Sequence, residues 1–330
     1  MQISIKKIIV PSIPLAALLV VCCLAIWIST FLGGRFNTLP NQSTILVQNI
    51  QTIILPNTLL SNLVSLLFTL ANAFLLAQIN NRFTIIRNRT FLPIVIFLLL
   101  MSTWSETHAS NGSHISLTLF ILALFHFFSM SRDKKASEQA FMGSFLISVS
   151  SIFINPLIYM IPICLIGFMI FQSFSLRTFL AAIFGTVSPW IIYLSIRYLL
   201  FPDSFFLQAF MVIPTIDLSL PGLSLPDLIY IGSITAIMII SLVSLFSLTH
   251  SDAIHTRNKL NFMAFILVCL LVLVALFRSQ YVSFLPLIAM VYSILISHPL
   301  TLRQNNFHGI LFWIFCFLNI AYVISKYILT

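Results

Sequence analysis

The stretch INNRFTIIRNRTFLPIVIFLLLMSTWSETHASNGSH, residues 79–114, places a basic loop, an apolar run and a polar loop in succession. Three arginines, beginning with Arg82, lie in the first loop, and Glu106 lies in the second. Lysine and arginine are enriched in the cytoplasmic loops of membrane proteins. The order therefore predicts that the apolar run, about 91–104, crosses a bilayer from a cytoplasmic loop at Arg82 to an outer loop at Glu106.

Composition predicts a membrane protein over the whole chain. The 330 residues are 60% hydrophobic and 7% charged, and the mean hydropathy is +1.09. A soluble domain is about 25% charged, and no window of this sequence has that character. Because a segment that crosses a bilayer must satisfy its own backbone hydrogen bonds, we expect an all-α polytopic transmembrane helical bundle, forming a single domain over 1–330.

Apolar runs separated by short polar loops predict about 11 spans. The predicted spans are residues 8–31, 58–78, 91–104, 114–131, 140–154, 157–173, 178–200, 228–248, 261–277, 282–298 and 309–325. The fifth and sixth are divided at Asn155-Pro156, where proline predicts a tight turn. Alternation places the N-terminus in the cytoplasm, the C-terminus outside, and a long outer loop at 201–226.

A further helix is predicted after the first span. Residues 44–55 are apolar apart from three clustered amides and lie between Pro40 and Pro56. This pattern favours a helix at the membrane interface, and a re-entrant segment is the alternative.

The net charge of +9 follows from the same topology. It places 12 of the 16 lysines and arginines on the cytoplasmic side and leaves Arg35, Arg197, Arg278 and Lys326 outside. This bias explains the basic balance without a nucleic-acid partner. No basic segment interleaved with aromatic residues is long enough to bind nucleic acid, so the expected surroundings are membrane lipids.

Cofactor, metal and nucleotide motifs are absent from the sequence. All five cysteines lie within apolar runs, and there is no C-x-x-C and no Cys/His cluster. There is also no glycine-rich phosphate loop, G-x-S-x-G or H-E-x-x-H. We therefore expect no cofactor and no metal site.

The predicted outer face carries the candidate site. Glu106 is the first acidic residue on that face and is a candidate general base, with His108 near enough in sequence to relay a proton. Arg35, Arg197 and Arg278 are candidate ligands for the phosphate of a lipid-linked substrate, because guanidinium groups bind phosphate through paired hydrogen bonds. The alternative is that all of these are ordinary interfacial residues that contact headgroups and water.

Within the predicted spans, the polar residues indicate packing. No Asp, Glu, Lys or Arg lies at a predicted midplane, which argues against a proton-coupled pump. We expect Asn72 and Asn319 to form hydrogen bonds between helices.

Three stretches, taken in order, resemble an uncharacterised family of Bacteroidota inner-membrane proteins that is known only as a domain of unknown function. They run from Asn80-Asn81-Arg82 to Phe91-Leu92-Pro93, from Phe141-Met142-Gly143-Ser144 to Ile154-Asn155-Pro156, and from Phe174-Ser175-Leu176-Arg177 through Gly185 to Pro189 and Trp190. The pattern is more loosely similar to C-type glycosyltransferases and related polysaccharide polymerases.

The resemblance implies a bacterial inner-membrane protein of the cell envelope. The looser similarity implies a substrate linked to polyprenyl phosphate and an interfacial helix after the first span. That class carries a catalytic acid in the first outer loop, whereas residues 32–57 contain no Asp or Glu. Glu106 would have to take the role, and similarity of fold is not evidence of activity.

Three functions remain open at this point, and whether the protein is an enzyme is undecided. The first is a non-catalytic membrane subunit or scaffold of a cell-envelope complex, which would have protein partners in the membrane. The second is a glycosyltransferase-like enzyme acting on a lipid-linked glycan at the periplasmic face. The third is a transporter of an apolar or lipid solute. An enzyme predicts a polar outer cavity joining Glu106 to an arginine, and a subunit predicts a broad apolar face with small residues.

Overall fold

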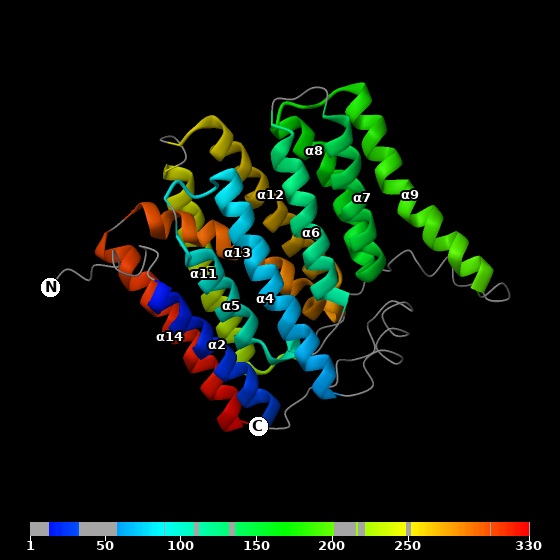
Figure 1. Ribbon diagram of the computed structural model, residues 1–330. Coiled ribbons are helices and arrows are strands. Elements are labelled where there is room, and N and C mark those ends of the chain that lie inside the picture. The colour runs from blue at the N-terminus through cyan, green and yellow to red at the C-terminus, as the bar shows by residue number, and fades with distance from the viewer. Residues whose placement is uncertain are drawn as a thin grey trace.

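The structure is a computed structural model in which helices account for most of the described chain (Figure 1). The described residues are 13–32, 58–88, 90–108, 112–131, 136–200, 216, 222–248, 252–303 and 305–329. The α-helices are α2 (Ile13–Leu32), α4 (Thr58–Phe83), α5 (Leu92–Thr103), α6 (Gly112–Ser129), α7 (Ser137–Phe153), α8 (Ile161–Ile170), α9 (Leu176–Leu200), α11 (Leu225–Leu248), α12 (Ile254–Leu276), α13 (Tyr281–Leu302) and α14 (Asn306–Leu329). Three 3-10 helices are η1 (Ser105–Thr107), η2 (Asn155–Met160) and η5 (Arg278–Gln280). These ranges contain no β-strand, so the all-α class is confirmed.

Each of the eleven predicted spans overlaps one of these α-helices. Within the described part of the chain, seven helices are long and apolar enough to cross a membrane, namely α4, α6, α9, α11, α12, α13 and α14. The protein is therefore a helical membrane protein, while the count of 11 spans and the orientation of the termini stay predictions. The predicted interfacial helix at 44–55 lies outside the described residues, as does most of the loop at 201–226.

Helices α5 and α13 form the centre of the bundle. Most residues of α13 are buried within the protein, and almost every residue of α5 is buried. A helix that is apolar on all sides is stable when neighbouring helices surround it. This explains why α5, with only 12 residues, is helical without being long enough to cross a bilayer alone.

The Asn155-Pro156 turn is where the sequence predicted it. Helix α7 ends at Phe153, Ile154 is extended, and Asn155 begins η2, which leads into α8. Pro156 has no backbone N–H to donate, and its ring would clash with the carbonyl of residue 152 in a continuous helix, so α7 cannot run through it. The segment 140–173 is thus two helical units rather than one long helix.

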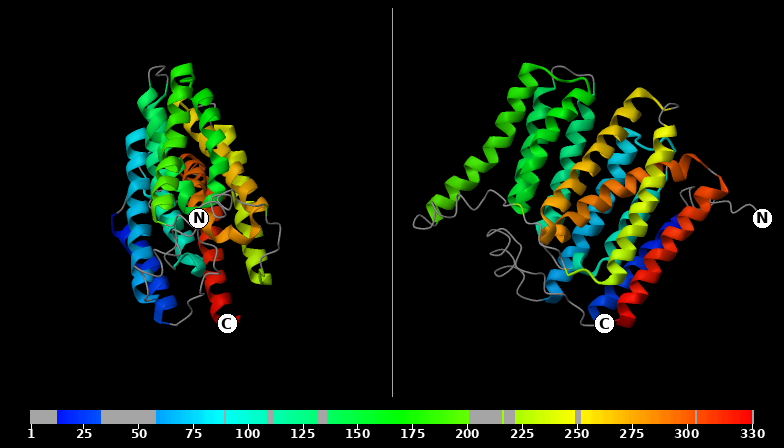
Figure 2. Two further views of the ribbon diagram at one scale, coloured as in Figure 1. Left: turned by 90° about the vertical axis from the view of Figure 1, so that its right-hand side faces the viewer. Right: turned by 180° about the vertical axis from the view of Figure 1, so that it is seen from behind.

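Helix α9 packs along α7 and leans away from the rest of the bundle towards its C-terminal end (Figures 1 and 2). A Cβ atom added to Gly185 would lie 2.4 Å from the backbone oxygen of Phe141, so the two helices can approach this closely only with glycine here. On its other side α9 exposes large side chains such as Phe184, Ile191 and Leu199. Those side chains suit contact with lipid.

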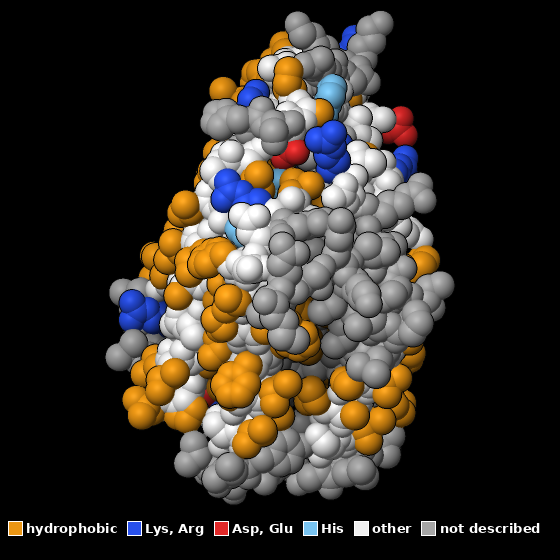
Figure 3. All heavy atoms as spheres, turned by 90° about the vertical axis from the view of Figure 1, so that its left-hand side faces the viewer, with side chains coloured by type: hydrophobic (Ala, Val, Ile, Leu, Met, Phe, Trp, Pro, Cys, Tyr) orange, Lys and Arg blue, Asp and Glu red, His pale blue; other side chains and the backbone are white. Residues whose placement is uncertain are grey.

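The loops predicted to be cytoplasmic lie together at one end, here called the basic end and defined by Arg82, Arg177, Arg257 and Arg303. Contacts between these segments show that they are neighbours. Lys259 Nζ donates to Phe83 O over 2.9 Å, Asn258 Nδ2 donates to Ile170 O over 3.0 Å, and Arg303 Nη2 donates to Ser247 Oγ over 2.7 Å. Figure 3 shows charged side chains gathered mostly in the upper half of one face, above a region dominated by apolar side chains.

Candidate functional site

At the opposite end, α11 begins with a carboxylate that caps its own helix. Ser224 donates its backbone N–H and its hydroxyl to Asp227 Oδ2, over 2.9 and 2.7 Å. Serine three residues before an acid is the pattern of an N-terminal capping box. A carboxylate in the first turn also interacts favourably with the positive end of the helix dipole. The local sequence therefore fixes the position of Asp227.

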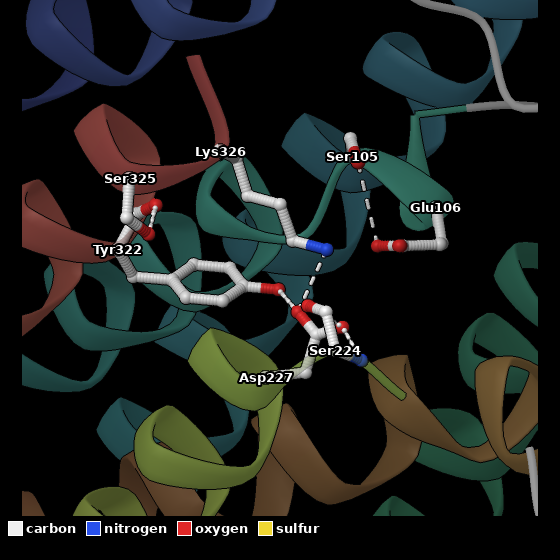
Figure 4. A network of polar contacts seen from close by, with 7 residues as sticks. All are labelled: Ser105, Glu106, Ser224, Asp227, Tyr322, Ser325 and Lys326. Atoms are coloured by element: carbon white, nitrogen blue, oxygen red, sulfur yellow. Dashed lines mark hydrogen bonds and ion pairs between the residues drawn. The ribbon is translucent and has the colours of Figure 1, made fainter. Parts of the chain in front are cut away.

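The same carboxylate binds the last turns of α14 (Figure 4). Lys326 Nζ lies 2.7 Å from Asp227 Oδ1, and the Tyr322 hydroxyl donates to that oxygen over 2.7 Å. The Asp227 side chain is 8% exposed and that of Lys326 is 31% exposed. This ion pair joins the N-terminus of α11 to the C-terminal part of α14, and it is reachable from outside at the lysine.

Next to the ion pair, on the side of the protein interior, lies a cluster of three aromatic rings. Tyr230 and Tyr322 are stacked with ring centroids 4.2 Å apart, and Trp104 lies 5.5 and 5.7 Å from them. Deeper still, Asn319 Oδ1 accepts hydrogen bonds of 2.8 Å from the hydroxyls of Thr103 and Tyr230. The predicted role of Asn319 as an interhelical hydrogen-bonding residue is confirmed, and so is that of Asn72, which bonds to α6.

A cavity of about 180 Å³ begins beside this cluster. Helices α11 and α12 both pack against α13, and the cavity lies between them over a floor formed by α13 and α5. Most of the residues that line it are aliphatic. The aromatic residues of the lining are Trp104, Tyr230, Tyr281 and Tyr292. Because Thr235 of α11 and Leu271 of α12 line the cavity and are exposed, it opens sideways between the two helices. We call it the α11–α12 groove.

Glu106 lies at this same end, in η1, and its side chain is partly exposed. Its neighbours Trp104 and Thr107 line the groove. Figure 4 shows its carboxylate pointing towards the space that the Lys326 ammonium also faces. We call the end of the bundle that carries Glu106, Asp227 and Lys326 the acidic end. The structure thus places Glu106 at the same end as Asp227 and Lys326, two residues that the sequence did not single out for the site.

The candidate arginines are not gathered around Glu106. Arg278 belongs to η5, three residues before the groove residue Tyr281, and its Nε donates to Ala275 O over 3.2 Å. Arg197 is buried in the last turn of α9, the part of α9 that leans away from the bundle (Figure 2). Arg35 lies outside the described residues. Of the two candidate arginines that the structure describes, Arg278 is the one near the groove, and the phosphate-binding and catalytic roles stay predictions.

His108 has a packing role in the structure. Its ring stacks on Trp27 with centroids 3.9 Å apart, and Nε2 lies 3.2 Å from Met101 O. Burial lowers the pKa of His108 from 6.5 to about 4, although the hydrogen bond with Met101 acts in the opposite direction. The imidazole is neutral at physiological pH and sits in the interior. This position does not favour the proton relay considered from the sequence.

Sequence reasoning missed the pairing of Asp227 with Lys326 and Tyr322. One signal was visible, because Ser224 and Asp227 precede the apolar run of α11 with capping-box spacing. Nothing in the sequence shows that a residue 99 positions later in the chain reaches this cap. Within the described ranges, no group of three or more His, Cys, Asp or Glu residues could hold a metal ion.

The fold and the groove define a helical membrane protein with a lateral apolar cavity that has charged residues at one end. The chain belongs to a family of unknown function, DUF6427, which it matches over residues 39–329. No curated protein matched the chain. No solved structure matched it either.

Proposed function

We propose that this protein binds an amphipathic membrane lipid in the α11–α12 groove. The hydrocarbon chain of the lipid lies against the cavity walls, and its headgroup lies beside Glu106, Asp227 and Lys326. One observation carries the proposal: the cavity opens sideways between two helices that are apolar enough to cross a membrane. A ligand dissolved in the bilayer reaches such an opening directly, without passing through water.

The volume of the cavity supports a chain rather than a whole enclosed ligand. Pockets that enclose a small molecule measure about 300–1,000 Å³, and this one measures about 180 Å³. It accommodates part of a chain, and the remainder extends through the opening into the bilayer. The polar groups stand at one end of the groove, as the headgroup of an amphipathic molecule requires.

The exposed surfaces of the peripheral helices support a lipid environment. Helix–helix contacts in membranes are enriched in small residues. The exposed side chains of α9 and α14 include large ones, such as Phe184 and Ile192 on α9 and Trp313 and Phe317 on α14. These faces fit lipid better than a partner helix. A role as a subunit of a cell-envelope complex in a bacterial inner membrane stays a prediction, and lipid binding is compatible with it.

A second candidate is a transferase that acts on a lipid-linked glycan. The observation in its favour is that Glu106 lies beside the groove and remains partly exposed, as a general base must. Against it, Arg197 lies on a helix that leans away from the groove. If the protein is this enzyme, Glu106→Gln abolishes turnover of a polyprenyl-phosphate-linked sugar. Lipid binding without turnover is the expected result.

Two substitutions on α12 test the proposed function. Leu271 lines the groove and is 47% exposed, while the adjacent Val272 is 50% exposed and does not line it. We expect Leu271→Trp to obstruct the groove and Val272→Trp to leave it open. The full chain is purified in detergent, stripped of lipid and titrated with phospholipid, and the tightest bound lipid is counted by native mass spectrometry. Loss of that lipid in Leu271→Trp alone supports the proposal, and equal binding by both variants overturns it.

A further inference from the structure

We infer that the headgroup site of the α11–α12 groove selects a zwitterionic phospholipid that carries a primary ammonium group, such as phosphatidylethanolamine. The inference rests on the proposed function and adds the chemistry of the ligand. Its starting point is a difference between Glu106 and Asp227, the two carboxylates that define the acidic end among the described residues.

Asp227 has no acceptor capacity left for a ligand. A carboxylate offers about four lone-pair sites. At Asp227 they are taken by the backbone N–H and hydroxyl of Ser224, the hydroxyl of Tyr322 and the ammonium of Lys326. Asp227 therefore positions Lys326 and holds α11 to α14. It is a structural residue of the site.

Glu106 is in the opposite condition. Its hydrogen bond comes from the Ser105 hydroxyl over 3.4 Å, which is long for an O–H donor. In the described part of the chain, no nitrogen of Lys, Arg or His lies within 4.0 Å of its carboxylate. The side chain is nevertheless partly buried. A partly desolvated carboxylate without a cation is a strong attractor for one.

Lys326 supplies the opposite charge close by. Its ammonium pairs with Asp227 and remains 31% exposed, and Figure 4 shows it facing the same space as Glu106. The site therefore offers a cation to a lipid phosphate and an anion to a lipid ammonium. A primary ammonium has three donors to give to Glu106. A quaternary choline has none, and an anionic glycerol headgroup brings no positive charge at all.

The polar and apolar parts of the site together favour a lipid as the ligand. A free amine would be attracted by Glu106 but would leave the adjoining cavity unfilled. The cavity walls continue from Trp104 and Thr107, the neighbours of Glu106, along α11, α12 and α13. A phospholipid with a primary amine satisfies both parts at once.

The test compares headgroups at constant chain length. The full chain in detergent, stripped of lipid, is titrated with phosphatidylethanolamine, phosphatidylcholine and phosphatidylglycerol bearing identical acyl chains, and dissociation constants are taken from native mass spectra. We expect phosphatidylethanolamine to bind about tenfold more tightly than phosphatidylglycerol, the effect of one charge-assisted hydrogen bond. In Glu106→Gln the ratio falls to about one, while phosphatidylglycerol still binds. Glu138→Gln, which removes an exposed acid in the first turn of α7, keeps the tenfold ratio.

The outcomes separate this inference from the proposed function. Equal binding of the three lipids by the unmodified chain, or an unchanged ratio in Glu106→Gln, overturns the inference. If Leu271→Trp then still abolishes binding, the groove remains a lipid site without headgroup selection. If Leu271→Trp has no effect, the groove is not the site and the proposed function falls as well.

Discussion

The two ends of the bundle use their charges differently. At the basic end, Lys259 bonds to the last carbonyl of α4, and Asn258 bonds to the last carbonyl of α8. Such contacts satisfy carbonyls that have no partner within their own helix, so these side chains hold helices together. At the acidic end, Asp227 does the same work, but Glu106 does not. The acidic end therefore combines a carboxylate whose acceptor sites are filled, Asp227, with one that has acceptor sites for a ligand, Glu106.

Two close contacts between titratable side chains extend this comparison. At the basic end, His298 Nε2 lies 3.0 Å from Asp252 Oδ2, and both side chains are almost fully buried. At the acidic end, the lysine of the Asp227–Lys326 pair is partly exposed. The His298–Asp252 pair is inaccessible to water, so it contributes to packing alone. The Asp227–Lys326 pair can also contact a ligand, because Lys326 is accessible.

The largest expected change in stability comes from lowering the pH, and it acts through His108 near the acidic end. Its pKa is about 4 in the folded protein and 6.5 in the unfolded chain. Between these values the unfolded chain binds a proton that the folded protein does not, so stability falls as pH falls, by about 1.4 kcal/mol per pH unit. Thermal unfolding in detergent measures this between pH 7 and 4. His108→Phe keeps an aromatic ring against Trp27 but removes the titrating group. Its unfolding free energy should therefore fall less steeply with decreasing pH than that of the unmodified protein, by about 1.4 kcal/mol per pH unit. The same pH dependence of stability in the unmodified protein and in His108→Phe would contradict a buried, neutral His108.

Removing Asp227 should have the next largest effect. Asp227→Ala breaks a helix cap and the ion pair with Lys326, and we expect a loss of about 2–3 kcal/mol, less than for a fully buried pair because Lys326 is partly exposed. Glu106→Gln is the matched control and should change stability by less than about 0.5 kcal/mol. The midpoint of unfolding in detergent distinguishes them. Equal losses in the two variants would remove the distinction between a structural and a ligand-facing carboxylate.

We expect Tyr322→Phe to lower the free energy of unfolding by a smaller amount. The substitution keeps the ring stacked on Tyr230 and removes one hydrogen bond to a charged acceptor, which costs about 1.5 kcal/mol. The same unfolding measurement applies. A change of zero would indicate that water replaces the hydroxyl, and Asp227 would then have acceptor capacity for a ligand.

Sequence reasoning recovered the helices of this protein better than their arrangement. Each predicted span overlaps a helix, and the turn at Asn155-Pro156 is correct, because hydropathy and proline act locally. The central position of α5 was not predictable, because an apolar helix looks the same whether lipid or protein surrounds it. The roles of the candidate site residues stay predictions, and only their positions can be compared. Glu106 and Arg278 lie at one end beside the groove, but Arg197 lies on a different helix that leans away.

The groove itself depends on which helices are neighbours, and no local pattern encodes that. Residues of α11 and α12 follow each other in the chain, yet both helices pack chiefly on α13. The contact between Tyr322 and Asp227 spans 95 positions. Long-range pairing of this kind is visible only in the folded molecule.

The most direct test of lipid binding is a cryo-EM structure of the full chain in nanodiscs made with phosphatidylethanolamine. We predict density for a hydrocarbon chain between α11 and α12, in contact with Leu271 and Tyr292, with its headgroup between Glu106 and Lys326. A groove closed by direct packing of α11 on α12, with ordered lipids only elsewhere on the surface, would contradict the account.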